Sequence, residues 1–133
     1  MPAMIAIDTN VLVRLLTADD AAQTRRAAAL FEEGDIFLAK TVLLETEWVL
    51  RFSYQLSRPT IVTTLKNVLG LAQVKVEDGF ALAAALTLFE SGMDFADALH
   101  LASSRDAAQF ATFDAQLKKR ADRDAPNHSV ILL

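Results

Sequence analysis

The sequence contains no cysteine, and it has only four glycines, three prolines and a single tryptophan. The absence of cysteine excludes disulfide bonds, thiolate catalysis and zinc sites built on cysteine. The chain also has no internal repeat, no low-complexity tract and no linker-like segment. These absences favour a single domain over residues 1–133.

The N-terminus lacks the charged head and apolar run of a signal peptide, and no apolar run is long enough to span a bilayer. We therefore expect a cytoplasmic protein with no membrane association. The 13 basic and 17 acidic side chains give a net charge of −4, which argues against a protein that coats nucleic acid non-specifically. An enzyme that acts on nucleic acid is not excluded, because carboxylates gathered at a metal site could supply the whole excess.

With 53% hydrophobic and 23% charged residues, the chain can build one globular core. Short β-branched runs alternate with longer segments of helical period, a pattern typical of an α/β fold with a mostly parallel central sheet. We expect about five short strands flanked by helices. The expected strands are residues 4–7, 36–39, 74–76, 110–112 and 130–132. The expected helices are residues 10–16, 21–33 and 42–56, one that begins near Pro59, and three within 79–92, 94–106 and 114–122.

The stretch "MIAIDTNVLVRLL" places Asp8 at the end of the first expected strand, directly before a helix. Asp8 could cap that helix, although Asn10 could do the same. An acid at the carboxyl end of a strand, followed by Thr9 and Asn10, is also suited to a hard cation, because Mg²⁺ and Mn²⁺ prefer carboxylate and amide oxygens. The segment alone leaves both interpretations open.

The helix "TVLLETEWVLRFSYQL" contains two glutamates with different surroundings. Glu47 precedes Arg51 by one turn and is explained by an ion pair. Glu45 has apolar neighbours at helical spacing, including Trp48 and Phe52. An unpaired charge on such a face is costly unless a cation or a water-filled pocket meets it. The alternative is that Glu45 lies at the edge of this face and reaches solvent.

In "MDFADALHLA", Asp94 is an expected N-cap and Asp97 falls at the third helical position. Asp97 could complete the cap or interact with the helix dipole. Its small and apolar neighbours also suit a helix packed beside a cleft. His100, one turn later, is better explained as an orienting or structural group than as a metal ligand.

"QFATFDAQL" repeats the arrangement of the opening segment, with an apolar run that ends on an acid before a helix. Asp114 is a good N-cap for that helix. Since the carboxyl ends of parallel strands share one edge of a sheet, Asp8 and Asp114 could also meet there. Converging carboxylates repel one another and would require divalent cations.

The segments "AIDTNVLVRLL", "TVLLETEWVLR", "DFADALHLA" and "FATFDAQL", in this order, resemble the four acidic motifs of PIN-domain ribonucleases. The resemblance is to the VapC-type toxins of toxin–antitoxin modules and covers nearly the whole chain. It implies that the metal-binding, catalytic acids are Asp8, Glu45, Asp97 and Asp114. It further implies that Thr112 supports the site and that Thr9 and Asn10 follow the first acid. Asp94 and His100 match positions where the family is less uniform.

The resemblance implies an endoribonuclease that uses one or two Mg²⁺ or Mn²⁺ ions and leaves a 5′-phosphate and a 3′-hydroxyl. It also implies a VapB-like antitoxin and a homodimer. Single-stranded or looped RNA is the expected substrate. Apolar residues in "WVLRFSYQL" and "TIVTTLKNVLGLA" could form the partner surfaces or simply the core. The RNA-binding residues are unknown. Candidates for guiding RNA are the basic residues Lys40, Arg51, Arg58, Lys118, Lys119 and Arg120.

Three other functions compete with this hypothesis. A phosphatase of the haloacid dehalogenase type would need an acid where Asn10 stands. A receiver domain would need an adjacent acidic pair near the start and a late lysine, and neither is obvious. A PIN-like module that binds RNA or protein without cleavage is disfavoured by the four intact acids.

Overall fold

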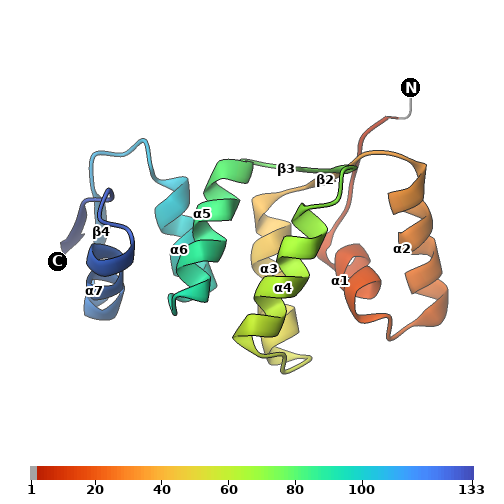
Figure 1. Cartoon of the computed structure of the whole chain (residues 1–133), viewed down its shortest axis with the longest axis horizontal. Coiled ribbons are helices and arrows are strands. Elements are labelled where there is room, and N and C mark those ends of the chain that lie inside the picture. The colour runs from red at the N-terminus through yellow and green to blue at the C-terminus, as the bar shows by residue number, and fades with distance from the viewer. Residues whose placement is uncertain (1–2) are drawn as a thin grey trace. The chain divides into compact units, whose positions relative to one another are not determined.

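The structure is a computed structural model that describes residues 3–133. Within this range the chain forms seven helices and five strands, in the order shown in Figure 1. The chain divides into two compact units, Met1–Gly79 and Phe80–Leu133, and each is described by itself.

The first unit contains a parallel sheet of three strands in the order β1-β2-β3. These strands are β1 (Ile5–Ala6), β2 (Ile36–Leu38) and β3 (Val74–Val76). Ile36 in the central strand is paired with Ile5 on one side and with Val74 on the other. Because all three strands run in the same direction, their carboxyl ends lie at one edge of the sheet, and Asp8 follows β1 at that edge.

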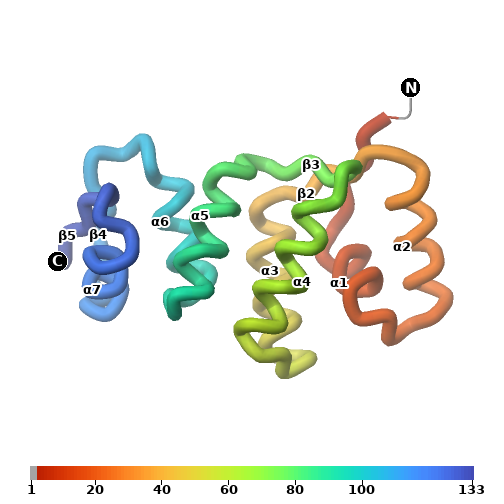
Figure 2. Tube along the Cα trace, in the orientation of Figure 1, coloured from red at the N-terminus to blue at the C-terminus, as the bar shows by residue number. Residues whose placement is uncertain are grey.

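Four helices complete the first unit (Figure 2). They are α1 (Thr9–Thr17), α2 (Ala21–Glu33), α3 (Lys40–Phe52) and α4 (Arg58–Leu69). The α1 helix packs against both α2 and α3, and α3 also packs against α4. Fully buried side chains such as Leu12, Leu43 and Ile61 form the core between these helices and the sheet.

The second unit contains two parallel strands, β4 (Phe110–Thr112) and β5 (Val130–Leu132). Its helices are α5 (Gly79–Glu90), α6 (Phe95–Ser103) and α7 (Ala115–Asp124). The α7 helix packs on both strands. The rings of Phe89 on α5 and Phe95 on α6 pack edge to face, with their centroids 5.5 Å apart. Asp114 directly precedes α7, and Asp97 lies in the first turn of α6.

The predicted α/β fold class is confirmed, since helices alternate with five short strands that all pair in parallel. The five strands form a three-stranded and a two-stranded sheet, whereas the sequence predicted one central sheet. Each strand lies within its expected range, and α2 has the expected bounds. The predicted helix over residues 42–56 is wrong at both ends, because α3 begins at Lys40 and stops at Phe52. Gln55 adopts a left-handed conformation with φ of 52°, which helical geometry does not permit. The single domain over residues 1–133 stays a prediction.

The apolar faces of α3 and α4, which the sequence suggested as partner surfaces or core, differ in their exposure to solvent. On α4, Ile61, Val62 and Leu65 are buried, as core packing requires. On α3, the side chains of Trp48 and Phe52 are 53% and 55% exposed. Among residues 3–133, no helix has both the length and the apolar character needed to cross a bilayer.

Candidate metal centre

Asp8 occupies the N-cap position of α1. Its backbone is extended, with φ of −89° and ψ of 176°, and its Oδ1 accepts a hydrogen bond from the Val11 N–H at 3.2 Å. The prediction that Asn10 could take over this cap is wrong, because helical geometry already begins at Thr9 and places Asn10 inside the first turn. The Asp8 side chain is exposed, so capping does not prevent its carboxylate from meeting a ligand.

An open pocket of about 310 Å³ joins the start of α1 to α3. It is lined by Asp8, Thr9, Asn10, Thr41, Val42 and Glu45. Thr9 is buried, whereas Asp8 and Asn10 are exposed. The first unit thus brings together the two acids that the sequence predicted for it, with an amide side chain beside them.

Glu45 is exposed on α3. Its apolar neighbours Trp48 and Phe52 are also more than half exposed, so Glu45 reaches solvent and lines the open pocket. Glu47 is the buried glutamate, with only 1% of its surface accessible. Two hydrogen bonds from the Arg51 guanidinium, at 2.7 and 3.2 Å, satisfy the Glu47 carboxylate, which confirms the predicted pair.

Asp97 is partly buried at the start of α6, beside other acids of the second unit. Its N–H donates to Oδ2 of Asp94 at 3.2 Å, which confirms Asp94 as the N-cap. Burial raises the pKa of the Asp97 carboxyl, and repulsion from Asp94 and then from Asp114 raises it further, while His100 opposes the shift. A cation would relieve the same repulsion that raises this pKa.

Asp114 caps α7, as expected, and its Oδ1 accepts hydrogen bonds from the N–H groups of Gln116 and Leu117 at 2.9 and 3.2 Å. The Thr112 hydroxyl accepts a hydrogen bond from the Asp114 N–H at 3.0 Å. Thr112 therefore fixes the backbone from which the Asp114 carboxylate projects, which is consistent with a supporting role.

Each unit gathers hard oxygen donors, but neither gathers a full ligand set. Among residues 3–133, no three histidine, aspartate or glutamate side chains stand in a group that could hold a metal ion. Asp8 and Glu45 share a pocket in the first unit, and Asp97 and Asp114 interact electrostatically in the second. Carboxylates of this kind fit Mg²⁺ or Mn²⁺ and do not fit a soft metal.

The basic side chains named as RNA-guiding candidates are partly committed to other contacts. Lys40 forms an ion pair with Asp78 at 3.3 Å, and Lys118 forms one with Asp122 at 3.0 Å. The Arg51 guanidinium contacts Glu47 and also lies over the Phe52 ring. These residues are therefore weaker candidates for contacting a phosphate.

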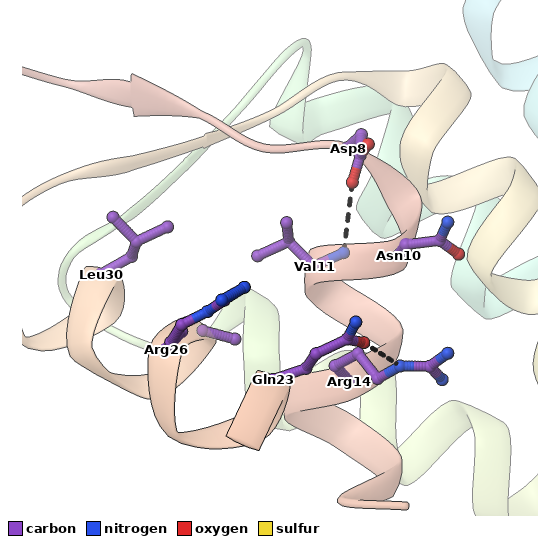
Figure 3. Close-up of a pocket in the computed structure, with 8 residues that line it drawn as sticks. Asp8, Asn10, Val11, Arg14, Gln23, Arg26 and Leu30 are labelled. Carbon is purple, nitrogen blue, oxygen red and sulfur yellow. Dashed lines mark hydrogen bonds between the residues drawn. The ribbon is translucent and has the colours of Figure 1, made fainter. Parts of the chain in front are cut away.

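Sequence reasoning missed a second pocket that also reaches Asp8. It lies between α1 and α2, and Arg14, Gln23 and Arg26 contribute its polar lining (Figure 3). No motif marks these residues, because an arginine in an alanine-rich helix has the same pattern whether it faces a pocket or bulk solvent.

The family model described as "PIN domain" matches residues 5–123, which covers every acid of the candidate centre. No curated protein matches the chain.

Proposed function

The chain belongs to the PIN domain family, generally a nuclease fold, and from this membership we propose that it is a metal-dependent endoribonuclease that acts as the toxin of a toxin–antitoxin pair. The observation that supports the proposal most strongly is the open pocket lined by Asp8, Asn10 and Glu45. Two exposed carboxylates beside an amide, at the end of a strand, make a site for a hard cation that solvent and substrate can reach.

We assign the metal ligands to Asp8 and Glu45 of the first unit and to Asp97 and Asp114 of the second. Bound Mg²⁺ or Mn²⁺ would lower the pKa of a water molecule and stabilise the charge that develops on a phosphodiester. Asp8 and Asp114 are oriented by their caps, and Thr112 orients the backbone of Asp114. These acids are thus held in place before any substrate binds, which reduces the reorganisation needed for catalysis.

The proposed toxin role requires a VapB-like antitoxin, and the activity would be exerted in the cytoplasm. The exposed pair of Trp48 and Phe52, whose rings lie 5.0 Å apart, is a suitable surface for the homodimer. Aromatic side chains of this size are enriched at protein interfaces.

Cleavage of single-stranded RNA by the purified protein tests the proposal. We expect cleavage of tRNA or rRNA fragments in Mg²⁺ or Mn²⁺, none in chelator, and none with the Asp8→Asn variant. The Asp20→Asn variant is the matched control, because Asp20 caps α2 in the way that Asp8 caps α1 but lines neither pocket. Cleavage that persists in chelator would contradict the mechanism. Binding of RNA without cleavage would favour a non-catalytic PIN module.

A further inference from the structure

The pocket between α1 and α2 shares Asp8 and Asn10 with the pocket that contains Glu45. Its volume is about 370 Å³, within the usual range for small-ligand pockets. Val11, Ala27 and Leu30 give it an apolar part. Because the two pockets share residues, a ligand in this pocket lies directly beside the candidate metal centre.

The two arginines of this pocket differ in their contacts. The Arg14 guanidinium donates to Gln23 at 2.7 Å and to Asp19 at 3.0 Å. The Arg26 guanidinium forms no hydrogen bond or ion pair with any part of the chain that the structure describes. Its side chain is exposed and extends from α2 toward Val11 on α1 (Figure 3). The pocket therefore contains a cation that is available to a ligand.

We propose that this pocket binds one nucleotide of a single-stranded RNA, adjacent to the phosphate that is cleaved. Arg26 contacts the nucleotide's phosphate, and the base packs on Val11 and Leu30. This subsite rests on the proposed ribonuclease function and identifies where the substrate strand continues beyond the metal centre.

Charge complementarity supports a nucleotide as the ligand of this pocket. The carboxylates of Asp8 and Glu45 repel a nucleic-acid backbone, so a neighbouring cation is needed to hold the strand. A guanidinium suits this role, because its planar donors match phosphate geometry and its charge does not titrate. A pocket with an apolar part favours an unstacked base, which only an unpaired strand presents.

The test uses the full-length protein and a fluorescein-labelled single-stranded RNA of random sequence, with binding measured by fluorescence anisotropy in chelator so that no cleavage occurs. Arg26→Ala is compared with Arg25→Ala. Arg25 is the adjacent residue of α2, is also exposed, and does not line the pocket. Both variants remove the same charge, so a general electrostatic effect weakens both equally.

We expect Arg26→Ala to weaken RNA binding about five- to tenfold. The slope of log K against log salt concentration should become shallower by about 0.7, the value for one lost phosphate contact with a single strand. Arg25→Ala should change the affinity by less than about twofold. Arg26→Lys should restore part of the affinity. Equal effects of the two alanine variants would overturn the subsite, as would a wild-type protein that binds no RNA. If Arg26→Ala left RNA binding unchanged but abolished binding of the proposed antitoxin, that result would also overturn the subsite.

Failure of this proposal and failure of the proposed function give different results. A wild-type protein that binds RNA through Arg26 but cleaves none contradicts only the nuclease activity. A protein that cleaves RNA equally well with and without Arg26, and binds it equally well, contradicts only the subsite.

Discussion

Asp8 and Glu45 line the same pocket, Asp8 from the capping position of α1 and Glu45 from the exposed surface of α3. Asp8 has a structural role in its cap and a proposed role as a metal ligand, and two substitutions separate them. Asn is as good a cap as Asp, whereas Ala is not. We expect Asp8→Asn to reduce RNA cleavage to background while changing the free energy of unfolding by less than about 0.5 kcal/mol. Asp8→Ala should lose cleavage and about 1 kcal/mol of stability.

Urea denaturation measures the stability of the Asp8 variants, and cleavage in Mn²⁺ measures their activity. Full activity of Asp8→Asn would show that Asp8 serves only as a cap.

Glu45 and Glu47 lie in the same helix, and their roles should be opposite. Glu45→Gln removes an exposed charge of the pocket, so we expect lost cleavage with unchanged stability. Glu47→Gln weakens the buried contact with Arg51, so we expect stability to fall by about 1–2 kcal/mol while the specific activity of the folded enzyme is retained. Thermal unfolding followed by circular dichroism, together with RNA cleavage, checks both variants. If Glu47→Gln alone abolished cleavage, the assignment of the two glutamates would be reversed.

The raised pKa of Asp97 predicts that the metal-free protein loses folding stability as the pH rises. The pKa is raised by burial and by repulsion from Asp94 and Asp114, so ionisation is less favourable in the folded chain than in the unfolded chain. Stability is therefore lost as the pH rises from 3.8 through the raised pKa, and the loss persists above it. In chelator at neutral pH, Asp97→Asn should be more stable than the wild type, and the difference should vanish well below pH 3.8, where the carboxyl is protonated in both states.

Asp94→Asn provides the control for Asp97, because Asn retains the cap while removing one repelling charge. It should lower the pKa of Asp97 and give part of the same stabilisation. Urea denaturation across the pH range measures both effects. Equal stability of the wild type and Asp97→Asn at every pH would contradict the predicted repulsion.

The strands and helix starts of this chain could be predicted because the signals that determine them are local. The runs before Asp8 and Asp114 are apolar and β-branched, and each acid stands at the first position where a helix needs an acceptor for its free N–H groups. Such patterns are complete within a few residues of sequence. The end of α3 could not be predicted in this way, because the left-handed conformation of Gln55 has no distinctive sequence signal.

The surroundings of the acids depended on contacts distant in sequence. Helical spacing showed that Glu45 has apolar neighbours, but it could not show that Trp48 and Phe52 are exposed, since exposure depends on which other elements cover α3. The pocket that contains Arg26 depends on how α2 packs against α1, which no single segment encodes. The candidate acids were therefore predictable as residue types in order, whereas the pockets around them were not.

Metal binding should stabilise the protein through the same acids that the cleavage reaction needs. A ligand that binds only the folded state adds about 2.7 kcal/mol of stability at a concentration one hundredfold above its Kd. We expect Mn²⁺ to raise the Tm of the wild-type protein, to raise that of Asp20→Asn equally, and to leave that of Asp8→Asn and Asp97→Asn almost unchanged. Differential scanning fluorimetry with Mn²⁺ and with chelator measures these shifts. Because Asp20 is also a capping acid and lies outside both pockets, an equal loss of the shift in all three variants would indicate diffuse binding to surface charge instead of binding at the proposed centre.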